Sequence, residues 1–265
     1  MTKIAHECPV SIFEIVQPYT DYDYFLVHLL DEVPEYKQKY FKAREKGREI
    51  ILDNSIFELE EAFDLDKFAN KVKELKPTWY IIPDVLEDCT GTIYKGLEWV
   101  EKYDDLPGKK IGVVQGKNYA EIVDCYNFWN NEDVDMIAIS FDYSWYEFIY
   151  PNPNKYISWA LGRVKLLGDL LNDGVLNPDK KHHLLGASLP LEFKLIRLSG
   201  YDFIYSIDTS SPIVHAIKKK KYEENFGLST KESQKLFTMI NYPSDKINKQ
   251  LLYHNMMEFR KYVNG

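Results

Sequence analysis

Cysteine is scarce in this sequence, and no pattern joins the three residues present. Cys8, Cys89 and Cys125 are widely spaced, and neither a CxxC pair nor a Cys/His cluster occurs. A disulfide framework or a structural zinc site needs such groupings. We therefore interpret the three thiols as ordinary buried or partly buried side chains, and expect neither a metal nor a cofactor.

Long apolar runs are missing as well. The longest, such as Phe25 to Leu30, are far too short to cross a bilayer, and residues 1–7 contain no signal-peptide core. These absences predict a cytoplasmic protein without a membrane partner.

Net positive charge and glycine-rich phosphate loops are also absent. The formal net charge is −8, which argues against broad nonspecific binding of nucleic acid but leaves room for a local basic patch. Neither GxGxxG nor GxxxxGK[ST] occurs. A doubly wound nucleotide-binding sheet is therefore disfavoured.

What the chain does have is a repeating pattern of apolar runs that end on polar residues. With 265 residues, 45% of them hydrophobic, it can bury a large core as one domain. Strand-like runs end near residues 55, 85, 116, 142, 188 and 208, with helix-like segments between them. This alternation is typical of βα units in a parallel sheet. Polar residues at successive strand ends favour an α/β fold of the (β/α)₈ TIM-barrel type.

The two ends of the chain are harder to assign. Ser11–Val16 and Tyr24–Leu30 are predicted as short strands that form a hairpin or belong to different layers, followed by a helix over 31–46. No convincing last strand follows Asp208, so we expect an irregular or incompletely closed barrel with C-terminal helices over 230–240 and 245–263. One domain over 1–265 would then contain an N-terminal part (1–48), catalytic βα units (49–212) and a C-terminal part (213–265).

Five strand ends carry residues with a common chemical logic: Asp53, Asp84, Gln115, Gly186 and Asp208. Carboxylates that share a site shift one another's pKa, so that one stays ionised while another holds a proton. An Asp and a Gln beside backbone groups suit the edge of a purine-like base. Each residue alone is equally well explained as a cap or loop anchor; Asp208 in particular begins a turn-like Asp-Thr-Ser-Ser-Pro segment.

The order of these segments resembles the tRNA-guanine transglycosylase superfamily, including phage relatives that insert 7-deazaguanines into DNA. The similar segments are Leu52-Asp53-Asn54-Ser55-Ile56-Phe57-Glu58, Pro83-Asp84-Val85, Ile111-Gly112-Val113-Val114-Gln115-Gly116, His182-His183-Leu184-Leu185-Gly186 and Ile207-Asp208. The resemblance spans roughly residues 49–212, and the segments around Gln115 and Gly186 are its specific parts.

The resemblance implies a role for each strand end. Asp208 would be the nucleophile at the sugar C1′, and Asp53 the general acid and base for the exchanged base. Other residues would bind the base. Asp84 and Gln115, with the adjacent Gly116, would contact its edge, Phe57 and Leu185 would lie against its faces, and the Leu185–Gly186 backbone would complete the site. Such a double displacement proceeds through a covalent glycosyl-enzyme.

Departures from the family pattern bear on the substrate. Ser55-Ile56 stand where the family has paired glycines, Ile139-Ser140 stand where a Gly-Gly pair is expected, and the zinc-binding segment that supports tRNA docking is missing. The expected partners are therefore nucleic acid, with DNA ahead of tRNA, and a 7-deazaguanine base, in the host cytoplasm if the chain is phage-encoded. A homodimer is compatible with this interpretation. Alternatives are a hydrolytic N-glycosidase or nucleoside hydrolase, and a noncatalytic base-binding subunit.

A basic run follows the last predicted strand within about ten residues. It comprises Lys218, Lys219, Lys220 and Lys221. Lysines so close to a strand end could hold phosphates beside the site. The alternative is a solvated charge run beside a helix.

Overall fold

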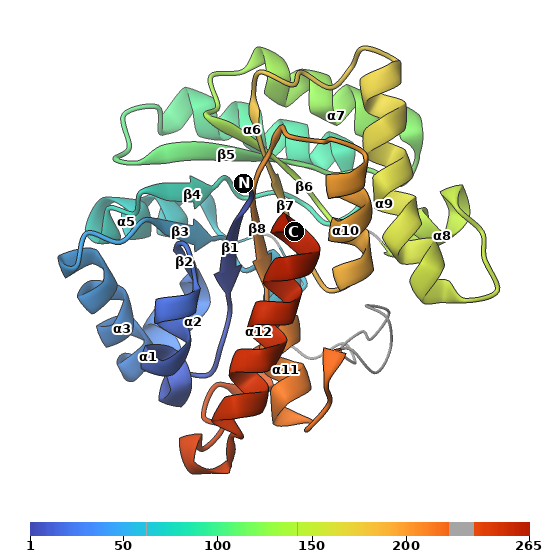
Figure 1. The fold of residues 1–265 in the computed structure, drawn as a ribbon. Helices are drawn as coiled ribbons and strands as arrows, with labels where there is room; N and C mark the ends of the chain where they lie inside the picture. Colours follow the sequence, from blue (N-terminus) through green and yellow to red (C-terminus); the bar gives the residue numbers. More distant parts are fainter. Residues whose placement is uncertain (62, 142, 223–235) are drawn as a thin grey trace. The chain divides into compact units, whose positions relative to one another are not determined.

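The computed structural model describes residues 1–61, 63–141, 143–222 and 236–265 (Figure 1). The contacts divide the chain into two compact units. The first unit comprises Met1–Asp21, Phe141–Pro178 and Leu184–Gly265, and the second comprises Tyr22–Ser140 and Asp179–His183.

In the described residues, eight strands give the α/β class and the (β/α)₈ TIM-type arrangement that the sequence predicts. Their order in the sheet is β1-β8-β7-β6-β5-β4-β3-β2, and the pairings with a defined register are all parallel. Because β1 and β2 are the ends of this order, the arrangement is incomplete in the described part of the chain. The strands are β1 (Lys3–His6), β2 (Asp23–Leu26), β3 (Ile50–Asp53), β4 (Trp79–Ile81), β5 (Lys109–Val114), β6 (Met136–Ile139), β7 (Lys181–Leu184) and β8 (Ile204–Thr209).

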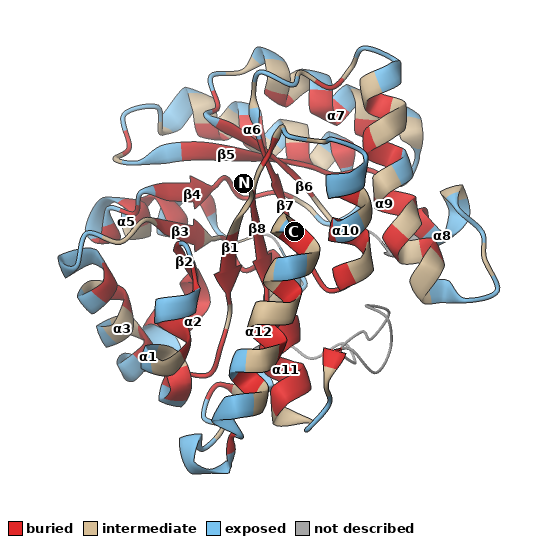
Figure 2. Cartoon of the chain, in the orientation of Figure 1, coloured by how far each residue is buried: buried red, intermediate tan, exposed pale blue. Residues whose placement is uncertain are grey.

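The second unit contains the regular βα repeat. Strand β2 pairs with β3, β3 with β4, β4 with β5 and β5 with β6. Most strand residues are buried, whereas the helices alternate buried and exposed positions (Figure 2). Its helices are α2 (Val27–Glu32), α3 (Pro34–Glu45), α4 (Ile56–Leu59), α5 (Leu65–Leu75), α6 (Cys89–Lys102) and α7 (Tyr119–Asn131).

Helix α5 shows how the sequence determines these elements. Asp64 caps it by accepting a hydrogen bond from the Lys67 backbone N–H at 2.8 Å. Phe68, Val72 and Leu75 recur at helical spacing and are buried. The helix therefore packs through one apolar face.

The first unit is built around β1, β8 and the C-terminal helices. Its α-helices are α1 (Phe13–Val16), α8 (Tyr143–Ile149), α9 (Lys155–Asn172), α10 (Pro190–Leu198), α11 (Ser211–Ile217) and α12 (Lys249–Asn264). Short 3-10 turns are η1 (Val10–Ile12), η2 (Gln17–Tyr19), η4 (Leu236–Met239) and η5 (Ser244–Lys246). No helix in the described ranges has the length and apolar character needed to span a membrane.

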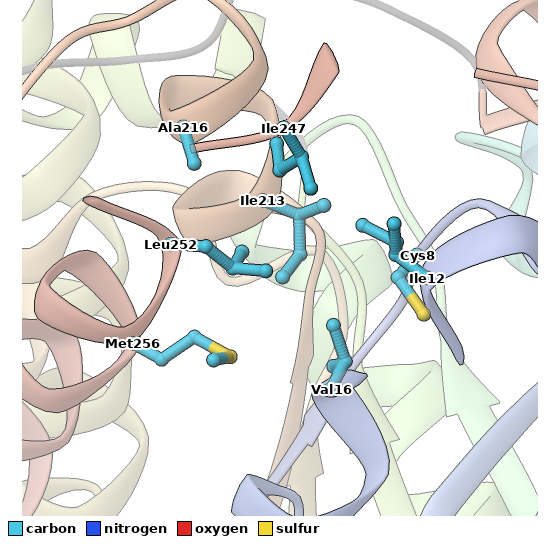
Figure 3. Packing of buried hydrophobic residues seen from close by; sticks show 8 residues of the cluster. All are labelled: Cys8, Ile12, Val16, Ile213, Ala216, Ile247, Leu252 and Met256. Atoms are coloured by element: carbon cyan, nitrogen blue, oxygen red, sulfur yellow. The ribbon is translucent and has the colours of Figure 1, made fainter. Parts of the chain in front are cut away.

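The predicted strand over Ser11–Val16 is wrong. This segment is helical, in η1 and α1, and Tyr24–Leu30 is divided between β2 and α2. The two segments therefore form no hairpin. Ile12 and Val16 lie one helical turn apart and pack with apolar residues of α11, α12 and the chain before it, a cluster that comprises Cys8, Ile12, Val16, Ile213, Ala216, Ile247, Leu252 and Met256 (Figure 3). Burial of Ile12 and Val16 in this cluster therefore favours a helical conformation of the segment over an extended one.

The strand that the sequence pattern lacks after Asp208 is found at the N-terminus. Strand β1 pairs in parallel with β8, with Ala5 opposite Asp208. Helix α12 confirms most of the helix predicted over 245–263, although it begins only at Lys249. Of the helix predicted over 230–240, residues 230–235 lie outside the described residues, and 236–239 form a 3-10 turn instead.

Candidate functional site

Three strand ends of the second unit meet in one hydrogen-bonded network. The Asp84 carboxylate accepts from the Gln115 Nε2 amide at 2.7 Å and from the Asn54 Nδ2 amide at 2.7 Å. Asn54 directly follows β3, Gln115 directly follows β5, and Asp84 lies three residues after β4. Because neighbouring parallel strands end at the same edge, these side chains are brought together. Asp84 and Gln115 are thus in contact with each other, and their predicted binding of a base stays a prediction.

The network holds a carboxylate away from water. Asp84 is 2% exposed and Gln115 is 3% exposed. Burial raises the pKa of Asp84 above its usual value, and the hydrogen bonds from Gln115 and Asn54 oppose that rise. Both amides point their N–H groups at the carboxylate, so Asp84 acts as an acceptor towards each of them.

Gln115 also anchors the loop that follows β4. Its Oε1 accepts the Glu87 backbone N–H at 3.1 Å. Glu87 adopts φ +54°, a left-handed conformation that is unfavourable for a non-glycine residue. Within the part of the chain that the structure describes, one amide hydrogen and one carbonyl lone pair of Gln115 remain for a further partner. Its predicted contact with a base would use these.

Asp53 forms a separate arrangement at the end of β3. Its Oδ2 accepts the Tyr24 hydroxyl at 2.5 Å, and its Oδ1 accepts the Ser55 backbone N–H at 2.5 Å. Ser55 has φ +65°. The Tyr24 ring stacks on His183, with centroids 6.1 Å apart and planes 14° apart. Asp53 is therefore held by both oxygens, next in sequence to the Asn54 that binds Asp84.

The other two predicted base contacts in the second unit differ in environment. Phe57 lies on α4 and is 51% exposed. Gly116 is buried against the start of α7, where an added Cβ would lie 2.9 Å from the Glu121 Cβ and 3.0 Å from the Ile122 nitrogen. This close approach explains the glycine by packing, and its predicted contact with a base stays a prediction.

Asp208 lies near the end of β8 in the first unit and is 5% exposed. The Gly186 backbone N–H faces both of its carboxylate oxygens, at 3.2 Å and 3.3 Å. The Ala187 backbone N–H donates to the Asp208 carbonyl at 2.9 Å. The structure thus brings the predicted Asp208 and Gly186 together.

The hydroxyl residues that follow Asp208 attach β8 to the same loop. Thr209 Oγ1 donates to the Ala187 carbonyl, and Ser211 Oγ donates to the Ser188 carbonyl at 2.9 Å. Helix α11 begins at Ser211, and the Ser211 backbone N–H donates to Thr209 Oγ1 at 3.0 Å. The turn-like sequence after Asp208 is therefore used to join two strand ends.

Leu185 and Gly186 already use backbone groups that the resemblance assigns to the base. The Leu185 carbonyl accepts Arg163 Nη1 at 2.6 Å. Gly186 adopts φ +63°, which favours glycine, and its single N–H is directed at Asp208. Recognition of a base by this N–H would compete with Asp208, whereas the Leu185 carbonyl retains a second lone pair.

The basic run begins where α11 ends. Lys219 and Lys220 are exposed, whereas Lys218 and Lys221 are half-buried. The Lys220 carbonyl accepts Asn255 Nδ2 of α12 at 2.9 Å. The backbone of the run is thereby tied to α12, and its contact with phosphate stays a prediction.

Three residues that sequence reasoning missed support these arrangements: Asn54, Tyr24 and Arg163. Asn54 had a local signal, because it directly follows Asp53 at a strand end. Tyr24 and Arg163 had none, since they contact residues that are 29 and 22 positions away in the chain. Within the described ranges, no group of three or more His, Cys, Asp and Glu residues is arranged to hold a metal ion.

Comparison with known proteins gives no family for this chain. No protein-family model and no curated protein matches the sequence. A 3-hexulose-6-phosphate synthase from Salmonella typhimurium is similar in structure, with 13% identity and a TM-score of 0.47 over 96% of this chain and 100% of that one. A BexX/CysO complex from Amycolatopsis orientalis contains a chain with 8% identity and a TM-score of 0.44, over 98% of this chain and 92% of that one. Similarity at this level indicates no activity for this protein.

Proposed function

We propose that this chain is a pentosyltransferase that exchanges guanine for a 7-deazaguanine in nucleic acid, with DNA favoured over tRNA. One observation carries the proposal: the Asp208 carboxylate lies at the end of a buried parallel strand, with a backbone N–H facing both of its oxygens. A carboxylate held in this way is pre-oriented for attack on a sugar carbon. The carboxyl ends of the strands are where (β/α)₈ enzymes assemble their active sites.

The chemistry divides into two displacements at C1′. In the first, an Asp208 oxygen bonds to C1′, the C1′–N9 bond breaks, and guanine leaves with the electron pair and takes a proton from a general acid, the role that the resemblance assigns to Asp53. In the second, the incoming base loses its N9 proton to the same group, its nitrogen bonds to C1′, and the bond to Asp208 breaks. Both carboxyl groups return to their starting states, and no oxidant or other co-reactant is needed.

The buried amide and carboxylate network supports base recognition. An ionised Asp84 accepts hydrogen bonds, which suits the N1–H and amino edge of guanine and its 7-deaza analogues, while adenine presents an acceptor at N1. Removing Gln115 by Gln115→Ala would leave Asp84 and the Glu87 N–H each one partner short. At about 1–3 kcal/mol for a buried polar group left unpaired, base selectivity should fall about fivefold to 150-fold. Unchanged discrimination between guanine and adenine analogues would remove Gln115 from this role.

An exchange assay with the purified chain tests the proposal. Labelled guanine is incubated with single-stranded DNA, duplex DNA and tRNA, because a base stacked inside a duplex is inaccessible until it is flipped out. We expect label to enter single-stranded DNA, and the loss of this activity in Asp208→Asn. Asp202→Asn, the same change at an exposed position before β8, is the matched control and should retain activity.

The alternative functions give different results in the same assay. Release of guanine without uptake of label would indicate a hydrolase, in which water replaces the incoming base. Binding of the base without release or uptake would indicate a noncatalytic subunit. Uptake into tRNA alone would retain the chemistry and replace the substrate.

A further inference from the structure

Arg163 and Glu192 form a completely buried ion pair in the first unit. Arg163 lies on α9 and Glu192 on α10, both side chains are 0% exposed, and Arg163 Nε lies 2.5 Å from Glu192 Oε1. Burial raises the pKa of Glu192, while the charge and hydrogen bond of Arg163 oppose the rise. Desolvation makes such a pair a poor source of stability compared with apolar residues of similar size. Its presence is better explained by what the guanidinium holds.

The guanidinium is fixed from several directions. Besides Glu192, Arg163 contacts the Leu185 carbonyl through Nη1 at 2.6 Å, and its Cζ lies 4.5 Å from the centroid of the Phe141 ring. Phe141 in turn lies against the backbone of Gly186, where an added Cβ would be 3.4 Å from the Phe141 Cβ. The contacts of Arg163 therefore converge on the segment that follows β7.

The Leu185 carbonyl and the Gly186 N–H belong to the same peptide group. A peptide group is planar, so fixing the oxygen at one end restricts the direction of the N–H at the other. Arg163 holds the oxygen, and the N–H faces the two carboxylate oxygens of Asp208. One rigid group thus connects the buried ion pair to Asp208.

We infer that Arg163 and Glu192 are positioning residues, which orient the Asp208 carboxylate through the Leu185–Gly186 peptide group. The catalytic consequence rests on the proposed function, whereas the orientation of the peptide group does not. Arg163 and Glu192 touch neither base nor sugar in this role. Their loss should lower the rate of the first displacement and leave binding of the nucleic acid little changed.

The double variant Arg163→Met with Glu192→Leu tests this inference. It replaces the pair by apolar side chains of similar length and leaves no charge buried alone, so the fold should persist. Two properties are compared with wild type: the hydrogen-exchange rate of the Gly186 amide, measured by NMR, and the steady-state kinetics of guanine exchange, given as kcat and KM. We expect faster exchange of that amide by about tenfold or more, and a fall in kcat of about 10- to 100-fold with KM within about twofold.

Matched variants separate positioning from a general effect on the fold. Lys165→Met with Asp169→Leu removes an exposed ion pair from the same helix α9 and should change neither quantity. Arg163→Lys keeps the charge beside Glu192 but lacks the planar fork that reaches two acceptors, so it should also release the Gly186 amide. This variant decides the question if the double variant does not fold.

Unchanged protection of the Gly186 amide in the Arg163/Glu192 double variant or in Arg163→Lys, whichever is folded, would overturn the inference. A wild-type kcat in a variant whose Gly186 amide is released would equally overturn the link to Asp208. If wild-type protein exchanges no guanine, the proposed function fails, while the amide measurement still tests the orientation of the peptide group. The two failures are therefore distinguishable.

Discussion

Replacing Gln115 by glutamate places a second carboxyl group where the amide now binds Asp84. The two side chains have the same shape, and the introduced carboxyl group, when protonated, could donate to Asp84 Oδ2 as the amide does at 2.7 Å. Its ionised form could not, because two carboxylates in contact repel each other. The substitution Gln115→Glu therefore tests the network without changing its size.

The loss of stability in Gln115→Glu follows from comparing two free energies, the repulsion between two carboxylates and the protonation of one of them. At 2.7 Å and an effective dielectric constant of about 20, two unit charges repel by about 6 kcal/mol. Keeping one proton on the pair at pH 7, against an ordinary glutamate pKa of about 4.3, costs about 3.7 kcal/mol. Protonation costs less free energy than the repulsion, so the carboxyl pair binds one proton in the folded state. The pKa of the introduced carboxyl group is therefore higher in the folded state than in the unfolded state. The free energy of unfolding that the variant retains at low pH is lost as pH rises, and the loss is only about 1 kcal/mol at pH 5.

Urea unfolding of wild type and Gln115→Glu between pH 5 and pH 7.5 measures this difference. We expect the gap in unfolding free energy to widen by about 2–3 kcal/mol from pH 5 to pH 7. Gln38→Glu, the same change at an exposed position of α3, should stay within about 0.5 kcal/mol of wild type throughout. A gap for Gln115→Glu that does not depend on pH would refute the contact between Gln115 and Asp84.

Three further outcomes are expected. Burial, aided by the Arg260 charge and opposed by Asp21, lowers the pKa of His6 from 6.5 to about 3, so stability is lost as pH falls below 6.5, by about 2 kcal/mol at pH 5; His6→Gln should lose less between pH 7 and pH 5 in urea unfolding, and an equal loss would contradict this. Tyr24→Phe removes the hydroxyl that donates to Asp53, and should slow single-turnover base exchange about tenfold without weakening binding of DNA; a wild-type rate would separate Tyr24 from the chemistry. Changing Lys219 and Lys220 to Gln should reduce the salt slope of DNA binding by about one to two units with the exchanged base unchanged, and an unaltered slope would return the run to a solvated charge cluster.

The fold was predictable where strands are buried and end on polar residues. The runs that end at Asp53, Asp84 and Gln115 are recognisable as strands, because a buried parallel strand has apolar side chains on both faces. Strand β1 has only four residues, two of them Lys3 and His6, so it gives no such pattern. Ser11–Val16 was misassigned because an apolar pair four residues apart fits a helix as well as a strand.

Contacts in the candidate site could be expected from the sequence only where both residues lie at or just after the ends of strands that are neighbours in the sheet. Asp84 with Gln115, and Asp208 with Gly186, follow from neighbouring strands in a parallel sheet. Tyr24 and Arg163 reach their partners from the interior of other elements, so their roles depend on tertiary packing that no local pattern encodes. Tertiary packing likewise determines that the Gly186 N–H faces the Asp208 carboxylate.

A search for the covalent intermediate on Asp208 tests the proposed base exchange most directly. Purified protein is incubated with a guanine-containing single-stranded oligonucleotide in the absence of an incoming base, denatured, digested with protease and analysed by mass spectrometry. We expect a sugar-linked adduct on the peptide that contains Asp208, which is released when guanine is added before denaturation and is missing in Asp208→Asn. Base exchange by wild-type protein without this adduct, or base exchange by Asp208→Asn at the wild-type rate, would contradict it.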